Sequence, residues 1–168
     1  VIANDVELSP EERILLLSGP NAGGKTVLLK SVGLAAQMAR CGWPICASPN
    51  SQIPFFENLL VAIGDEQSVD AQLSTFAAHL KKLDEATKFS GSNTLLLVDE
   101  ICGSTDPEEG AGLARAFIET YRKNQVFAVI TSHLSPLKKG WSDDSGVING
   151  SLEYNEQSGR PSYQFLSG

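Results

Sequence analysis

The chain has 168 residues, a length that fits one compact domain over 1–168, because domains cluster between about 100 and 200 residues. Its hydrophobic share of 42% and charged share of 20% are typical of globular proteins and exclude wholesale disorder and a coiled coil. No apolar run approaches the roughly 20 residues that span a bilayer, and the net charge of -7 argues against broad non-specific nucleic-acid binding by this chain alone.

Short apolar runs along the chain predict strands. The strongest lie at 13–18, 94–99 and 126–131, each unbroken and bounded by polar residues, as in central parallel strands that are covered on both faces. Weaker strands are predicted at four further places, 52–56, 59–63, 151–154 and 162–166. The last two would form an antiparallel edge of the sheet.

Three segments between the strands carry apolar residues at helical spacing. These positions are Leu28, Val32, Ala35 and Ala39 in the first segment, Phe76, Leu80 and Leu83 in the second, and Leu113, Phe117 and Tyr121 in the third. Strands that alternate with helices predict an α/β fold with a mainly parallel central sheet flanked by helices.

The first motif, residues 19–26, reads G-P-N-A-G-G-K-T and satisfies G-x-x-x-x-G-K-[ST] between a predicted strand and a predicted helix. Its backbone N–H groups would cradle phosphate oxygens, Lys25 would reach the β- and γ-phosphates, and the Thr26 hydroxyl would ligate Mg²⁺. A plain glycine-rich turn is the alternative, but four fixed positions in this context rarely arise by chance. We therefore predict that the following residues bind nucleotide: Pro20, Asn21, Ala22, Gly23, Gly24, Lys25, Thr26 and Val27.

The run L-L-L-V-D-E at 95–100 brings two acids to the carboxyl end of an apolar strand, where open α/β sheets place their ligand sites. Asp99 would hold Mg²⁺ through water, and Glu100 would orient and deprotonate an attacking water. An Asp-Glu pair alone is better explained as a solvated turn, but the loop upstream favours the catalytic interpretation. The pair also favours an ATPase over a GTPase, whose water is usually placed by a glutamine.

Two histidines call for different interpretations. His133 comes just after the predicted strand 126–131, which in P-loop ATPases with an acidic pair usually lies between the P-loop strand and the acidic strand. It would then sense the γ-phosphate or position the water, although a single histidine is more often structural. His79 lies on a predicted helix, and we expect a structural or surface role for it.

The three cysteines, Cys41, Cys46 and Cys102, contain no C-x-x-C pair and predict neither a disulfide framework nor a zinc cluster. An intracellular, reducing compartment, the cytoplasm, fits this usage. The chain begins with Val1 and shows no signal pattern, so we expect it to be a fragment of a longer protein.

Five ordered segments together resemble the MutS family of DNA-repair ATPases, at 19–30, 64–68, 73–76, 99–110 and 131–133. Within that family, the G-D-E-Q-S of 64–68 and the T-D-P of 105–107 are similar to the MutS-two branch, which is associated with recombination control rather than classical mismatch repair. The resemblance covers nearly the whole chain, and five ordered motifs are far more specific than a P-loop alone.

The resemblance implies a P-loop NTPase fold of the ABC ATPase type, with ATP and Mg²⁺ bound at sites shared by a head-to-tail homodimer. Ser74 and Thr75 of one subunit would complete the site of the other, because a helix start with hydroxyls and free amides suits an anion. That Ser74 only caps its own helix remains an open alternative. The loop 103–106 would lie at the same interface.

Three residues need separate treatment. Related mismatch-repair proteins have an aromatic residue that stacks on adenine where this chain has Val1, so Ile2 would give the base only apolar and backbone contact. Cys102 stands where the family residue is more often small and unreactive, and we expect a structural role. Asp106, followed by Pro107 and by Glu109 three residues on, is also a good helix start, which leaves a purely structural role open for it.

Three functions follow from these patterns. The main one is a Mg²⁺-dependent ATPase, yielding ADP and phosphate, that converts dimer closure into movement of a DNA-binding clamp. The second is a nucleotide-switched binding module that acts on stalled ribosomes. The third, an ABC transporter subunit, is disfavoured because the chain has L-S-T at 73–75 and no L-S-G-G-Q. The family's terminal dimerisation helices, its core, lever and clamp regions and any Smr-type nuclease domain would lie outside this chain, so we expect slow turnover by the isolated domain.

Overall fold

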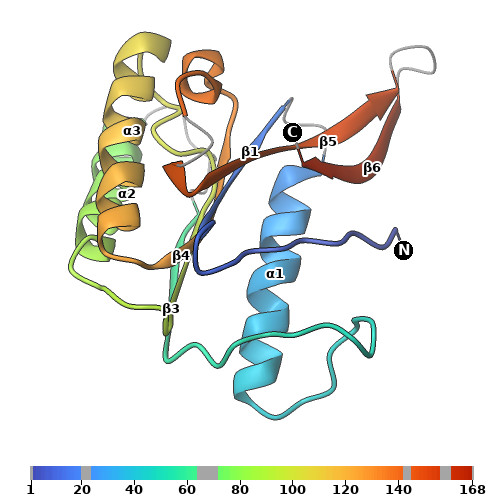
Figure 1. The fold of residues 1–168 in the computed structure, drawn as a ribbon. Coiled ribbons are helices and arrows are strands. Elements are labelled where there is room, and N and C mark those ends of the chain that lie inside the picture. The colour runs from blue at the N-terminus through green and yellow to red at the C-terminus, as the bar shows by residue number, and fades with distance from the viewer. Residues whose placement is uncertain (1, 20–23, 64–71, 142–144, 156–159, 168) are drawn as a thin grey trace.

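The computed structural model describes residues 2–19, 24–63, 72–141, 145–155 and 160–167 (Figure 1). The elements in chain order are β1 (Ile14–Ser18), α1 (Lys25–Arg40), β2 (Asn58–Ala62), α2 (Gln72–Ala86), β3 (Thr94–Val98), α3 (Pro107–Lys123), β4 (Phe127–Ser132), the short 3-10 helix η3 (Ser135–Lys138), β5 (Val147–Asn155) and β6 (Arg160–Ser167). No helix in these described ranges is long and apolar enough to cross a membrane.

The sheet has six strands in the order β2-β3-β4-β1-β5-β6. Every neighbouring pair is parallel except β5 with β6, which are antiparallel. The strands β1, β3 and β4 are buried along their whole length, as expected for apolar strands covered on both faces. The prediction that the strand before His133 lies between the P-loop strand and the acidic strand is confirmed, as is the antiparallel edge.

Helices cover both faces of the sheet and produce two cores (Figure 1). On one face, α2 and α3 pack over side chains such as Leu16, Leu96 and Ile130. On the other face, α1 packs over the intervening strand residues, including Leu17 and Leu97. Alternate residues of each central strand therefore serve opposite cores, which is the two-residue period of a strand.

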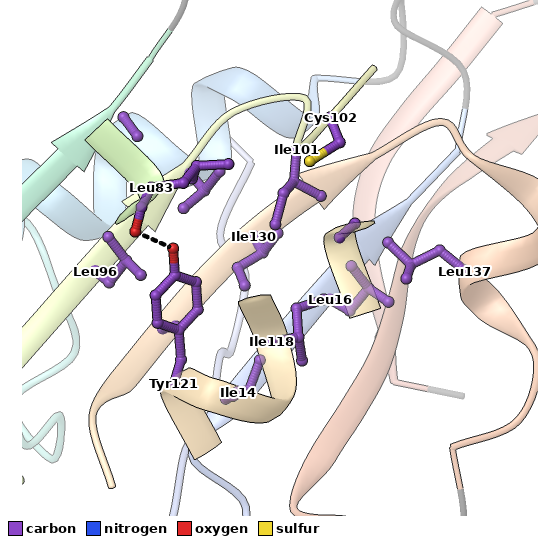
Figure 2. Close-up of a cluster of buried hydrophobic side chains, with 14 of the residues drawn as sticks. Ile14, Leu16, Leu83, Leu96, Ile101, Cys102, Ile118, Tyr121, Ile130 and Leu137 are labelled. Atoms are coloured by element: carbon purple, nitrogen blue, oxygen red, sulfur yellow. Dashed lines mark hydrogen bonds between the residues drawn. The ribbon is translucent and has the colours of Figure 1, made fainter. Parts of the chain in front are cut away.

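The two helices on the first face are also joined by a buried hydrogen bond (Figure 2). The Tyr121 hydroxyl of α3 donates to the carbonyl of Leu83 in α2 over 2.9 Å. Near it, the Asn124 side chain at the end of α3 donates to the carbonyl of Thr87 over 2.7 Å. Both bonds involve the carboxyl-terminal ends of the helices.

The predicted strand at 52–56 is wrong, because these residues form no strand. Pro54 lacks a backbone donor for a ladder. Phe56 is instead buried at the end of this irregular segment, and its ring meets that of Phe127 edge-on at 5.9 Å between centroids. The neighbouring prediction at 59–63 is confirmed by β2, displaced by one residue.

The apolar stripes of two helices are only partly as predicted, since Leu28 in α1 and Tyr121 in α3 are buried as expected. In α3, however, Leu113 faces solvent, and the helix also buries Ala111, Ala114 and Ile118. In α1 the buried positions are Lys25, Leu28, Leu29, Gly33 and Ala36. A Cβ at Gly33 would collide with Leu97, so the helix approaches the sheet closely at a residue that an apolar count ignores.

Candidate functional site

The carboxyl ends of three adjacent strands meet at one edge of the sheet. Ser18 at the end of β1 is in register with Ser132 of β4, and Val98 at the end of β3 with Ile130 of β4. The phosphate-loop motif follows β1, the acidic pair follows β3, and His133 follows β4. Three motifs far apart in the sequence are therefore brought to the edge where parallel sheets bind ligands.

Lys25, the first residue of α1, is buried at this edge of the sheet, with only 2% of its side chain exposed. Its ammonium donates to the carbonyl of Gly19 over 2.6 Å and lies 3.4 Å from a carboxylate oxygen of Glu100. Gly19 and Gly24 have φ values of 136° and 88°, which favour glycine. The predicted nucleotide-binding residues Pro20, Asn21, Ala22 and Gly23 lie outside the described residues.

Asp99 receives two hydroxyl groups on one carboxylate oxygen. The Thr26 hydroxyl from α1 donates to Oδ1 over 3.1 Å, and the Thr131 hydroxyl from β4 donates to the same atom over 2.6 Å. Hydroxyl and carboxylate oxygens are hard donors of the kind that Mg²⁺ prefers. The predicted metal pair, Thr26 and Asp99, is thus adjacent in the fold, and its chemistry fits this ion.

Glu100 occupies a tight turn directly after Asp99. Its φ of 51° is left-handed, and its backbone N–H donates to the Thr131 hydroxyl over 2.8 Å. The side chain, 19% exposed, lies between two basic groups: Lys25 on Oε1, and the Nδ1 of His133, which is 2.5 Å from Oε2. The two predicted catalytic residues, Glu100 and His133, are therefore in direct contact.

The turn after the acids packs closely on the histidine. A Cβ at Gly103 would lie 2.7 Å from Cε1 of His133, so only glycine fits there without displacing the ring. The turn ends at α3, where Oδ1 of Asp106 accepts from the N–H groups of Glu108 and Glu109 at 2.9 and 3.3 Å. The predicted helix start, with its cap and proline, is confirmed.

Cys102 is buried in this turn, and burial raises the pKa of its thiol to about 11. A thiol with such a pKa stays protonated at neutral pH and is a poor nucleophile. Its place in the apolar core agrees with the structural role expected for it (Figure 2). Cys41 and Cys46 are free and exposed.

The other predicted residues make none of the contacts described above. Val27 and Ile2 are 68% and 47% exposed and face solvent. Ser74 and Thr75 fall in the first turn of α2, but their side chains lie outside the described part of the structure. His79, further along α2, is partly buried, and burial first and the charge of Lys82 second lower its pKa, whereas the charge of Asp99 raises it.

Thr131 is a residue to which the sequence analysis gave no role in the site, although it belongs to the segment 131–133 that resembles the family. It contacts both acids. The available signals were that resemblance and a hydroxyl among apolar residues, two positions before His133, at the end of the strand between the two motif strands. The contacts of Thr131 with the two acids are set by the register of β4 beside β3. A local sequence pattern does not reveal that register.

Residues 15–166 match the family model described as MutS domain V. The chain belongs to the MutS domain V family. It is 44% identical over its whole length to the endonuclease MutS2 of Gemmatimonas aurantiaca, covering 20% of that protein. It is 41% identical to the endonuclease MutS2 of Streptococcus thermophilus and 40% to that of Streptococcus uberis, with 99% of this chain aligned to 21% and 22% of those proteins. The resemblance to the MutS-two branch is confirmed.

The chain spans about a fifth of the length of the curated relatives that it matches. The match covers every element from β1 to β6, so the sheet edge with its three motifs belongs to the region shared with the family.

Proposed function

We propose that this domain is an ABC-type ATPase of the P-loop NTPase fold, a single domain over 1–168, which hydrolyses ATP to drive a DNA-binding clamp. The observation that carries the proposal is the contact network at the sheet edge. Lys25, the metal pair and the Glu100–His133 pair come from three different segments, and pairwise contacts link Lys25 to Glu100, Glu100 to His133 and Thr26 to Asp99. The family membership supports a role in DNA repair or recombination.

Nucleotide binding would use the amino-terminal end of α1. The N–H groups of the loop and of the first helical turn, with the helix dipole, attract phosphate oxygens. The ammonium of Lys25 now lies against Gly19 and Glu100, and in the bound state it would turn to the β- and γ-phosphates. Ile2 would contribute apolar and backbone contact to the base.

Thr26 and Asp99 would hold Mg²⁺, which neutralises charge on the phosphates during transfer. Thr26 would bind the ion directly, and Asp99 through water. The hydrogen bond that Thr26 now donates to Asp99 keeps the two oxygens together.

Glu100 would act as the general base. The water oxygen attacks the γ-phosphorus, the bond from that phosphorus to the β–γ bridging oxygen breaks, and ADP leaves with the bond's electron pair. The proton of the water passes to the Glu100 carboxylate. His133, which contacts the other oxygen of that carboxylate, would orient it and sense the γ-phosphate.

The site would be completed in a homodimer, in which Ser74 and Thr75 of the second subunit approach the γ-phosphate. A helix amino terminus suits this anion, and α2 begins with these residues.

The decisive experiment compares Glu100→Gln with the wild type in the full-length protein. We expect the variant to bind Mg·ATP as the wild type does but to lose single-turnover hydrolysis, because the amide keeps the shape yet cannot accept a proton. Glu85→Gln, an exposed acid near the far end of α2, is the matched control and should hydrolyse ATP normally. Equal hydrolysis by the Glu100 variant would remove Glu100 from the base role.

The target of the ATP cycle requires a separate experiment. Pull-down with the full-length protein, offered branched DNA and ribosomes side by side, should retain DNA. The relatives are named endonuclease, which denotes an activity on nucleic acid and supports the expected retention of DNA. Retention of ribosomes alone would replace the DNA clamp with the nucleotide-switched binding module on stalled ribosomes.

A further inference from the structure

Thr131 makes three hydrogen bonds to three successive residues of the acidic turn. Its hydroxyl donates to Oδ1 of Asp99 over 2.6 Å and accepts the N–H of Glu100 over 2.8 Å. Its carbonyl accepts the N–H of Ile101 over 3.0 Å. The residue is fully buried in β4, between the strand that leads to the phosphate loop and the strand that leads to the acids.

The chemistry of these partners fixes the direction of the hydroxyl. An amide N–H can only donate, so the hydroxyl oxygen must accept from Glu100, and its single proton goes to the Asp99 carboxylate. Only a side chain that donates and accepts at the same place satisfies both partners. Serine keeps this pair of contacts, whereas valine has the shape of threonine without either of them.

The contact with Glu100 occurs at a residue whose backbone conformation is unfavourable. Glu100 has a left-handed φ of 51°, a conformation that non-glycine residues rarely adopt. A buried N–H without a partner is disfavoured. Without the Thr131 hydroxyl, the turn would lose the hydrogen bond that holds a residue of left-handed φ, and the backbone that places the Glu100 carboxylate between Lys25 and His133 would be less fixed.

Thr131 lies near the end of β4 and His133 just past it, two residues apart, which is the spacing that brings side chains of an extended chain to the same side. Thr131 therefore meets the backbone of the acidic turn while His133 meets the Glu100 side chain. Ser132 between them turns elsewhere, and its hydroxyl accepts the N–H of Leu134.

We propose that Thr131 is a positioning residue for the hydrolysis proposed above, an inference that rests on that proposed function. Its hydroxyl holds the Asp99 carboxylate at the metal position and sets the backbone of Glu100, so that metal binding and proton transfer both depend on one buried group.

The test uses the full-length protein with Thr131→Val and Thr131→Ser. Thr94→Val is the matched control, because Thr94 is equally buried in a central strand but its hydroxyl accepts from the Asn58 side chain at the opposite end of β3 from the acids. We expect the Val variant to lose about tenfold or more in single-turnover hydrolysis, as for a lost hydrogen bond to a charged group. It should also need more Mg²⁺ for half-maximal rate, while ATP affinity without metal stays unchanged. The Ser variant should recover both quantities, and Thr94→Val should match the wild type.

A second measurement does not depend on turnover. Mn²⁺ binding in the presence of ADP, followed by electron paramagnetic resonance, should weaken in Thr131→Val and recover in Thr131→Ser. Should the Val variant fail to fold, Thr131→Cys replaces it, because a thiol of similar size is only a weak donor and acceptor.

The results distinguish a failure of the proposed ATPase function from a failure of the proposed role of Thr131. No Mg²⁺-dependent hydrolysis by the wild type would overturn the proposed ATPase, and the Mn²⁺ measurement would still judge Thr131. Unchanged Mg²⁺ and Mn²⁺ dependence in Thr131→Val, or a uniform loss that Thr131→Ser does not repair, would overturn the positioning role.

Discussion

Glu100 shows how single residues define this site. Both of its carboxylate oxygens are in contact with basic groups, Lys25 on one side and His133 on the other. For the proposed reaction, Lys25 must exchange this carboxylate for phosphate oxygens. If Glu100 is the general base, nucleotide binding would therefore release one of the two contacts of its carboxylate and leave the contact with His133.

At the same scale, the cysteines differ in reactivity. Because the pKa of Cys102 is raised to about 11, only about one thiol in a thousand is a thiolate at pH 8. We expect iodoacetamide at pH 8 to modify Cys41 and Cys46 in the folded protein and to modify Cys102 only after unfolding. Mass spectrometry of the intact protein counts the labels. Three labels on the native protein at the rate of free cysteine would contradict the burial of Cys102.

Among the elements, α3 depends on its first turn. Asp106 is exposed and caps two backbone N–H groups, so its contribution is separable from packing. We expect Asp106→Ala to lower the free energy of unfolding by about 1 kcal/mol, and Asp106→Asn, which can still cap, to lower it much less. Urea denaturation of the purified domain measures both. Equal losses for the two variants would mean that the carboxylate charge, rather than the cap, stabilises the helix.

Strands, motifs and caps were predictable to different degrees, for physical reasons. The candidate phosphate-loop, acid and cap residues follow rules of local spacing, so the positions of Lys25 and Asp99 at the carboxyl ends of the strands and of Asp106 at the start of α3 could be predicted from sequence. The buried faces of α1 and α3 were only partly predicted because small residues such as Gly33 mark the closest approach to the sheet, whereas the periodicity argument weighs only large apolar residues. The role of Thr131 required the register of two parallel strands that lie far apart in the chain.

For the whole molecule, the central prediction concerns the second subunit. If Ser74 acts in trans, full-length Ser74→Ala and Lys25→Ala should each be impaired, and mixing them should restore part of the ATPase activity. Heterodimers then carry both defects in one composite site and neither in the other. Subunit exchange is verified by mass measurement.

A control mixture separates the possible results. Wild type mixed with the double mutant also leaves one site of each heterodimer intact. Activity in that mixture with none in the complementing mixture would limit Ser74 to capping its own helix. Inactivity in both would indicate that the two sites are strictly coupled.

The bond between Tyr121 and Leu83 has a mechanical consequence for such a dimer. It pins α2 and α3 together near their carboxyl-terminal ends, while both helices begin at the sheet edge that carries the site. A force on the first turn of α2 from a second subunit would act on both helices, because separating them would leave the buried Tyr121 hydroxyl without this partner.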